Sequence, residues 1–553
     1  MPELFSLLRR AWLPVALDDG RRVFVRPCDI SEPHEGRAIV RVATGRPDCD
    51  ISLTEFLIGL LAVTMDGTSH REWAKHYRNP PSRAALEAAF APLEPAMVLD
   101  GDGPRFFQDL ESLEGAVTPV EAFFMDAPAE HFVKPGRTQV LSRAGAAIAL
   151  ATLQTSAPAG GAGHRTSLRG GGPLTTLVLP GHAAHAEPSL WQRLWSNVPE
   201  RLQAEPEDYK RVFPWLGPTR ISDRSGVATT PEDVHPAQAF FGLPRRIRLA
   251  FEPNTQKLPC DQLGIVDDVI VTGYITRPWG TNYTSWSKGH PLSPYYKPKP
   301  NEPEFLPLHL KSSRVGYRQF LGMVLENPDG SRVPARSVDE FRSRAQNFEG
   351  EERRALRDCR LLVAGYAMDK MKPLDFAEAL VPLFVTGSEI GDQHVKDAAK
   401  HVIGAATLVA SQLSSAVKRA LYGERGDVKW DSTVLEGVQN RFWSDTEQEF
   451  YARLSSAAQA IVTPDGGVVD DPHSARRAHN EAWLAVIARH ALAIFDDAVP
   501  IEDAESAKIA DVIEGRKMLG SALVGSGPVG RKLFAELGLP EKEPKTKKGK
   551  KAA

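Results

Sequence analysis

The chain has 553 residues, 42% of them hydrophobic, so it can bury a large core and form two to four folding units of roughly 100–200 residues each. It carries 67 Lys+Arg and 70 Asp+Glu, a formal net charge of -3, so any attraction for nucleic acid must come from local basic patches. The four cysteines form no CxxC pair, which argues against a zinc ribbon or a disulfide scaffold and fits a reducing cytoplasm. The longest apolar runs fall well short of the roughly 20 residues that cross a bilayer, so we expect a cytoplasmic protein that does not enter the membrane.

The first part of the chain is predicted to open with a β-hairpin. Two strand-like runs, Trp12–Ala16 and Arg22–Arg26, flank a turn sequence that ends in Gly20. Helical spacing of apolar residues then predicts helices over Ser52–Met65 and Ser82–Ala91, each beginning at a serine able to cap free backbone N–H groups. Short strands, short helices and Gly and Pro breakers follow without a βαβ rhythm. We therefore predict one irregular mixed α/β domain over residues 1–384.

The apolar pattern of the last third is typical of long helices. Heptad spacing from Val395 to Ala420 places Val402, Val409 and Leu413 on one stripe of a helix. Further helices are predicted over Trp430–Ala457, over Ser474–Asp496, and over Asp503–Gly520 continuing toward Leu537. Four antiparallel helices with short loops make a bundle, here residues 385–540, and the charged tail 541–553 is predicted to be disordered. The predicted fold class is α+β.

Common catalytic signatures are missing from the sequence. It contains no P-loop, no GxSxG elbow and no HExxH motif. A GxGxxG match at residues 525–530 interrupts a helical region, whereas a dinucleotide loop follows a strand and opens a helix. His182 and His185 stand among Pro and Gly residues without an evident third ligand, which favours surface histidines. We expect no catalytic residue, no metal and no cofactor.

A glycine-rich stretch from Ser156 to Val178 is the most unusual segment. Bare backbone allows another molecule to approach main-chain N–H groups, and His164, Arg165 and Arg169 would add positive charge. These features suit a phosphate or groove contact. A flexible surface loop explains the same composition equally well.

Two further segments have a possible role in binding. Residues Arg277–Lys288 interleave basic and aromatic side chains, which suits nucleic acid, although a β-hairpin with packed aromatic pairs has the same composition. Apolar strands over Leu361–Tyr366 and Leu374–Phe376 flank a polar tip at Lys370 and Met371. Such a projecting hairpin could act as a wedge or be only a hairpin.

In this order, the segments resemble CasA, the large subunit of the type I-E CRISPR surveillance complex Cascade. The strongest match is the glycine-rich run Ala157–Val178 with its Leu-Arg-Gly-Gly and Thr-Thr segments. Supporting matches, spread over nearly the whole chain, are Trp12–Val15, Arg78–Pro80, His131–Lys134, Ala147–Leu150 and Gly365-Tyr366. The resemblance implies a non-catalytic subunit of an antiviral defence complex.

The resemblance also implies roles for particular residues in DNA recognition. The family's glycine loop, which reads the protospacer-adjacent motif (PAM) from the minor groove, falls on Ala159, Gly160, Gly161, Ala162 and Gly163, where the two alanines replace family glycines. The family's basic finger falls on Arg277. Its wedge, which opens the duplex and starts R-loop formation, falls on Lys370, flanked by Asp369 and Met371.

The implied partners are double-stranded target DNA, guide RNA, the other Cascade subunits and a helicase-nuclease. The loop Phe132–Arg143 would engage the 5′ handle of the guide RNA through Phe132 and Lys134, and the bundle would touch the displaced strand or the small subunits. Only Cys260 remains of a cysteine cluster seen in some members, so we expect no zinc. Two alternatives stay open: a metabolic enzyme with a helical appendage, and a scaffold subunit of another CRISPR class.

Overall fold

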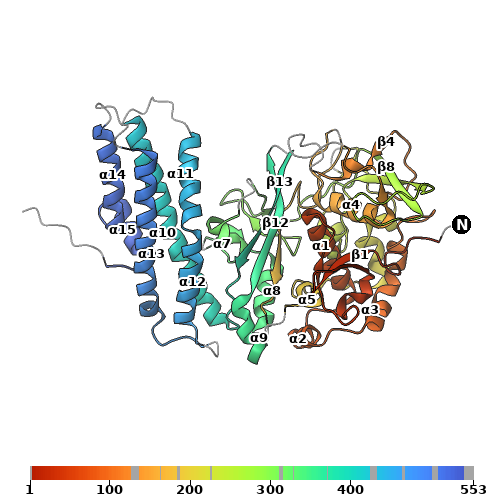
Figure 1. Ribbon diagram of the computed structural model, residues 1–553, viewed down its shortest axis with the longest axis horizontal. Coiled ribbons are helices and arrows are strands. Elements are labelled where there is room, and N and C mark those ends of the chain that lie inside the picture. The colour runs from red at the N-terminus through yellow and green to blue at the C-terminus, as the bar shows by residue number, and fades with distance from the viewer. Residues whose placement is uncertain are drawn as a thin grey trace, which may run out of the picture. The chain divides into compact units, whose positions relative to one another are not determined.

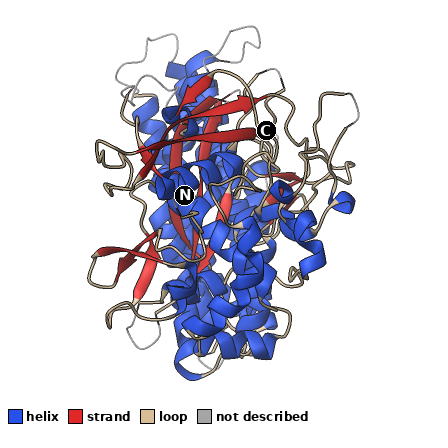
Figure 2. Cartoon of the chain, turned by 90° about the vertical axis from the view of Figure 1, so that its right-hand side faces the viewer, coloured by secondary structure: helices blue, strands red, loops and turns tan. Residues whose placement is uncertain are grey.

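The computed structural model describes residues 3–125, 136–161, 163–182, 187–224, 227–310, 315–327, 329–369, 372–423, 432–463, 467–500 and 509–540. Helices and strands both contribute to the fold, and the strands lie between Leu13 and Pro382 (Figure 2). The predicted α+β class is confirmed. The chain forms two compact units, the first made of Met1–Val315 with Gly322–Gly387 and the second of Gly316–Leu321 with Ser388–Ala553. Among the described residues, no helix combines the length and apolar character needed to cross a bilayer.

Small antiparallel sheets and short helices build the first unit. Its strands are β1 (Leu13–Leu17), β2 (Arg22–Val25), β3 (Ile39–Val42), β4 (Val117–Pro119), β5 (Leu141–Ser142), β6 (Thr175–Leu179), β7 (Arg246–Pro253), β8 (Val269–Arg277), β9 (Tyr295–Tyr296), β10 (Leu306–Pro307), β11 (Arg332–Val333), β12 (Arg360–Asp369) and β13 (Lys372–Pro382). Its helices are α1 (Pro47–Thr64), α2 (His70–Arg78), α3 (Arg83–Phe90), α4 (Arg143–Ser156), α5 (Leu190–Trp195), α6 (Tyr209–Val212), α8 (Arg336–Ala345) and α9 (Gly350–Ala355), and α7 (Phe320–Met323) spans the boundary between the units.

The N-terminal hairpin forms as predicted. Strands β1 and β2 pair with Leu13 opposite Val25, and β3 pairs with the other edge of β1. Ser82 caps α3 as expected, because its hydroxyl accepts a hydrogen bond from the N–H of Ala85. The predicted start of the preceding helix at Ser52 is wrong, since α1 begins five residues earlier at Pro47, which is suited to the first helical position because its φ is preset.

Two sheets position the segments singled out by sequence. In one, β8 pairs with β4, β5 and β7, and it ends at Arg277 opposite Arg246. In the other, β12 lies between β6 and β13, and Asp369 faces Lys372 at the end of the β12–β13 hairpin. Helix α4 is buried along nearly its whole length and packs against α1.

Long helices make the second unit (Figure 1). They are α10 (Glu389–Tyr422), α11 (Ser432–Asp445), α12 (Glu447–Ile461), α13 (Pro472–Ala498), α14 (Ile509–Leu523) and α15 (Gly527–Glu536). The predicted stripe is confirmed, since α10 buries Val395, Val402 and Val409 while it packs against α11, α12, α13 and α14. One continuous helix over Trp430–Ala457 is wrong, because α11 ends at Asp445 and α12 begins at Glu447. Trp430 itself lies outside the described residues.

A short segment far from the bundle in sequence completes its core. Tyr317 is fully buried, its ring stacks on Phe450 at 4.3 Å between centroids, and its hydroxyl lies 2.7 Å from that of Thr446, at the junction of α11 and α12. Because buried aromatic rings and satisfied hydroxyls stabilise a core, residues 316–321 are an integral part of the second unit.

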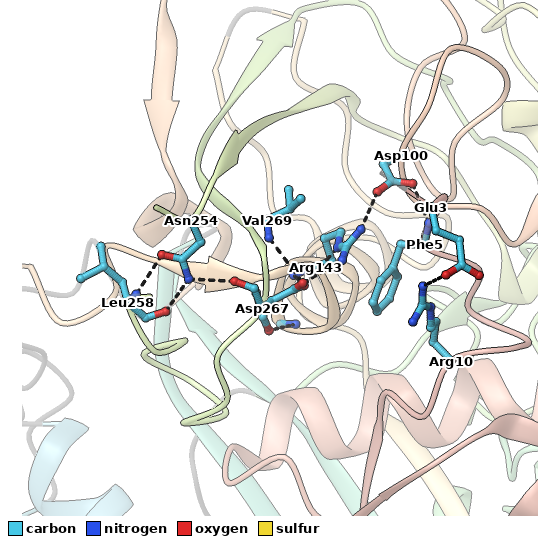
Figure 3. A network of polar contacts seen from close by, with 11 residues as sticks. Glu3, Phe5, Arg10, Asp100, Arg143, Asn254, Leu258, Asp267 and Val269 are labelled. Atoms are coloured by element: carbon cyan, nitrogen blue, oxygen red, sulfur yellow. Dashed lines mark hydrogen bonds and ion pairs between the residues drawn. The ribbon is translucent and has the colours of Figure 1, made fainter. Parts of the chain in front are cut away.

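Arg143 organises a polar network at the start of α4 (Figure 3). Its guanidinium donates to both carboxylate oxygens of Asp267, at 2.7 and 3.1 Å, and to Asp100 at 3.2 Å, and it lies over the ring of Phe5. Burial alone would raise the pKa of Asp267, but the hydrogen bonds from Arg143 outweigh it and lower that pKa below 3.8. The network therefore holds α4 in place electrostatically.

Replacing Arg143 by Met should lower the free energy of unfolding by about 3 kcal/mol at pH 7, because two largely buried carboxylates lose their partner. Asp267 contributes its stabilisation above its ordinary pKa of 3.8 and loses it as the pH falls through the lowered folded-state value. The difference between the two proteins in free energy of unfolding, measured with urea, should thus be largest near neutral pH and become smaller as the pH falls below 3.8. Arg10→Met, which removes an exposed pair with Glu3, is the control and should cost under about 1 kcal/mol. Equal costs for both variants would contradict the role of Arg143.

Candidate nucleic-acid interface

The glycine loop, residues 157–172, leaves the C-terminus of α4 and leads to β6. Its ends are tied together, because the N–H of Ser167 donates to the carbonyl of Ala157 at 2.9 Å and that of Gly172 donates to Ser156 at 2.9 Å. The sequence left two interpretations open, a binding loop and a flexible surface loop. These hydrogen bonds favour a loop with a defined path over a freely flexible one. Ala159, Gly160 and Gly161 are exposed, and Ala162 lies outside the described residues.

Three of the loop's six glycines, Gly160, Gly161 and Gly163, lie in its first half, and glycine is favoured at each for a different reason. Gly161 has φ of 85°, which favours glycine, and a Cβ there would meet only open space. A Cβ on Gly160 would lie 2.6 Å from Nη1 of Arg245, and one on Gly163 would lie 2.8 Å from Pro278 and 2.9 Å from the indole of Trp279. Only Gly161 therefore presents its backbone to an outside molecule without an internal packing requirement.

The charge expected from the loop is only partly available. Arg169 is buried and pairs with Glu55 of α1 at 2.7 Å, so the expectation that it offers positive charge is wrong. Burial, followed by the nearby charge of Arg245, lowers the pKa of His164, which favours its neutral form at pH 7. Arg165 donates two 2.8 Å hydrogen bonds to Ser222, without a carboxylate partner among the described residues.

Arg277 and the glycine loop are brought together. The N–H of Trp279 donates to the carbonyl of Gly163 at 2.7 Å, which places the residues after β8 along the loop. Arg277 is exposed at the end of β8 and has no ion-pair partner in the part of the chain that the structure describes. Its guanidinium is therefore available for an anionic ligand.

Of the aromatic residues in Arg277–Lys288, some are packed and one is exposed. Trp286 is buried and donates to the carbonyl of Thr229, and the hydroxyl of Tyr283 bonds to Gln238 and to the N–H of Leu243. The expected packing of aromatic side chains is correct for these two, but the expected β-hairpin is wrong, because β8 ends at Arg277 and residues 278–288 form no strand. Trp279 is 38% exposed.

The β12–β13 hairpin also reaches the glycine loop. A Cβ on Gly172 would lie 2.9 Å from both Tyr366 and Met368 of β12, so the end of the loop packs on the strand that leads to the hairpin tip. Asp369 is exposed beside that tip, and Lys370 and Met371 lie outside the described residues. Three segments far apart in sequence thus converge, namely the glycine loop, the end of β8 and the hairpin.

Arg245 is a residue of this site that sequence reasoning missed. Its guanidinium donates to the carbonyl of Pro158 and lies against Gly160, and its backbone N–H donates to Gln154 at 3.0 Å. Burial lowers its pKa to about 10, so it remains charged at pH 7. No pattern distinguishes it from its neighbour Arg246, which pairs with Asp109 and Glu111. Only the contact with the loop identifies it.

The remaining sequence predictions concern RNA and metal. Phe132 and Lys134 lie outside the described residues, and Arg143, which ends the predicted RNA-binding loop, is engaged in the network of Figure 3. Cys260 is buried, and its Sγ would lie 2.8 Å from a Cβ on Gly145. Within the described ranges, no group of three or more His, Cys, Asp or Glu side chains could hold a metal ion.

Comparisons with known proteins identify the family of this chain. Residues 6–494 match the family model of the CRISPR-associated protein Cse1. This chain belongs to the Cse1 family. The family is also called CasA, so the resemblance found in the sequence is confirmed. Cse1 homologues function within a CRISPR surveillance complex.

Solved structures share the fold of this Cse1 chain at low sequence identity. A CRISPR-associated protein from Thermus thermophilus is 17% identical, with a TM-score of 0.66 over 97% of this chain and 100% of that one. Cse1 from Thermobifida fusca is 18% identical, with a TM-score of 0.65 over 97% and 98% of the two chains. Cse1 from Acidimicrobium ferrooxidans is 18% identical, with a TM-score of 0.64 over 97% and 99%.

Arg169→Met should lower the free energy of unfolding by about 3–5 kcal/mol, because Glu55 is left buried without its cation. Arg165→Met, which removes hydrogen bonds but leaves no unpaired carboxylate, should cost about 1–2 kcal/mol. Urea unfolding of both variants measures the difference. If Arg165→Met lowered the free energy of unfolding more than Arg169→Met, the pair of Arg169 with Glu55 would not be what holds the loop in place.

Proposed function

We propose that this chain is the non-catalytic large subunit of a type I-E Cascade complex and recognises the PAM of double-stranded target DNA. The glycine loop would lie in the minor groove, Arg277 would reach beside it, and the β12–β13 hairpin would wedge the base pairs apart. The convergence of these three segments is the observation that carries the proposal.

The minor groove suits an exposed backbone with few side chains. The exposed loop carries no side chain larger than a methyl group at residues 159–161, so the edge of a groove can approach its backbone. Positive charge is added by Arg245 and Arg277, which have no carboxylate partner among the described residues. Minor-groove edges distinguish mainly A·T from G·C pairs. The subunit is therefore expected to accept several related motifs.

Strand opening follows from the same geometry. Inserting a hairpin tip between base pairs costs a few kcal/mol of unstacking per step, which pairing of the guide with the target beyond the wedge can offset. Lys370, between Asp369 and Met371, would be the inserted residue. Motif recognition would then start R-loop formation.

The other partners are proposed from the family alone. Phe132 and Lys134 would contact the 5′ handle of the guide RNA, and the second unit would touch the displaced strand or the small subunits and help recruit the helicase-nuclease for antiviral defence. In support, one structure with the same fold is that of a CRISPR RNA-guided surveillance complex before nicking, 15% identical with a TM-score of 0.56 over 94% of this chain and 99% of that one.

Gly161→Leu should weaken binding of motif-bearing duplex by at least about tenfold, because the new side chain occupies the open space that the groove would fill. Assembly with guide RNA should be intact. Gly20→Leu is the matched control, since Gly20 has φ of 84° and open surroundings in the β1–β2 turn, and so carries the same backbone strain of about 1–3 kcal/mol. Gel-shift titration of the assembled complexes gives both affinities. Unchanged affinity of Gly161→Leu would refute minor-groove reading by the loop and favour a scaffold subunit.

Lys370→Ala should slow duplex opening more than it weakens initial binding, because a wedge acts after the motif is engaged. Fluorescence of 2-aminopurine next to the motif follows opening, and gel shifts with a duplex that the guide cannot pair with report initial binding. Lys372→Ala removes a neighbouring exposed lysine at the start of β13 and should affect neither step. Equal losses in both steps for Lys370→Ala would contradict the wedge.

A further inference from the structure

Trp279 has an unusual combination of exposure and backbone strain. Its side chain is 38% exposed although it is the largest apolar type, and its φ of 68° lies in the left-handed region that bulky residues avoid. Strained backbone of this kind is unfavourable and persists where surrounding contacts impose it, often at functional sites. The contacts of Trp279 are therefore informative.

Contacts on both sides hold the indole at the edge of the glycine loop. The backbone N–H of Trp279 donates to the carbonyl of Gly163 at 2.7 Å, and its backbone carbonyl accepts a hydrogen bond from the N–H of Ser222 at 3.1 Å. The ring lies against Gly163, where a Cβ would approach within 2.9 Å, and the guanidinium of Arg165 lies 5.4 Å from the ring centroid. These contacts hold one part of the indole and leave another part exposed to solvent.

The other two aromatic rings of residues 277–288 are packed inside the fold, unlike that of Trp279. Trp286 is 6% exposed, and the hydroxyl of Tyr283 is fully hydrogen-bonded within the fold. The same segment thus packs two aromatic rings and keeps the third, nearest the loop, partly outside. An exposed indole gains free energy when a flat apolar partner covers it.

We propose that Trp279 is a DNA-contacting residue that packs against the sugar and base wall of the minor groove in the motif duplex. This inference rests on the proposed function and adds a non-ionic contact to it. Deoxyribose rings and exposed base edges offer the apolar surface that such a ring needs, and apolar side chains are frequent partners of the minor groove. Arg277 would supply charge beside it, so the two residues should differ in salt dependence.

Hydroxyl-radical footprinting of the assembled complex tests the contact in the unmodified protein. Oxidation of Trp279 should fall several-fold when motif-bearing duplex is bound and should not change with a motif-free duplex at the same concentration. Leu258, exposed at 36% in the turn between β7 and β8, is the internal reference. Unchanged oxidation of Trp279 in the DNA-bound complex would overturn the proposal, and this result does not depend on the folding of any variant.

Variants separate this proposal from the proposed function. Trp279→Ala should weaken duplex binding roughly tenfold without changing the slope of log affinity against log salt, and Trp279→Phe should retain most of the affinity. Arg277→Ala should reduce that slope by about 0.9 for the lost phosphate contact, with exposed Arg71→Ala as its control. Wild-type affinity of Trp279→Ala, with Arg277→Ala and Gly161→Leu both impaired, would overturn the Trp279 contact alone. If all three bound like wild type, the proposed function itself would fail.

Discussion

The buried ion pair between Arg169 and Glu55 fixes one end of the glycine loop to the core of the first unit. Glu55 lies in the middle of α1, and its carboxylate also accepts a hydrogen bond from Thr175, the first residue of β6. Arg169 completes the network by donating to Thr175 and Ser293 at 3.0 Å each. A buried pair of this kind contributes less to net stability than to uniqueness of position, because desolvation offsets much of its attraction. The pair of Arg169 with Glu55 therefore gives the glycine loop one defined path.

The other end of the loop is fixed by α4. Arg143 and its carboxylate partners hold the first turn of this helix, and Gln154 in its last turn bonds to the backbone of Arg245. A helix held at both ends acts as a rigid support, since hydrogen bonds within the helix satisfy the backbone groups of its interior. The same helix joins the predicted RNA-binding loop on its N-terminal side to the predicted DNA-binding loop on its C-terminal side. If the proposed function holds, guide engagement and motif recognition would share this one helix.

Glycine in this loop serves two separate needs. Gly160 and Gly163 accommodate Arg245 and Trp279, which are parts of the protein, whereas Gly161 permits a positive φ at an open position. Side chains at the first two positions would disturb internal packing before they met a ligand. Ala159 is exposed, so its methyl group is available to any molecule that binds the loop.

The amino-acid sequence was enough to predict the α+β class, the opening hairpin, the apolar stripe of α10 and the family, because these depend on local turn chemistry, short-range periodicity and ordered motifs. It also identified the glycine loop, Arg277 and the hairpin as candidate binding segments. Other properties are visible only in the folded chain: Arg169 is neutralised by Glu55, Arg245 supports Gly160, Tyr317 belongs to the helical unit, and Trp279 stays exposed while Trp286 is buried. These properties depend on partners more than 40 residues away in sequence, and no local pattern records which side chain a distant carboxylate, glycine or helix will meet.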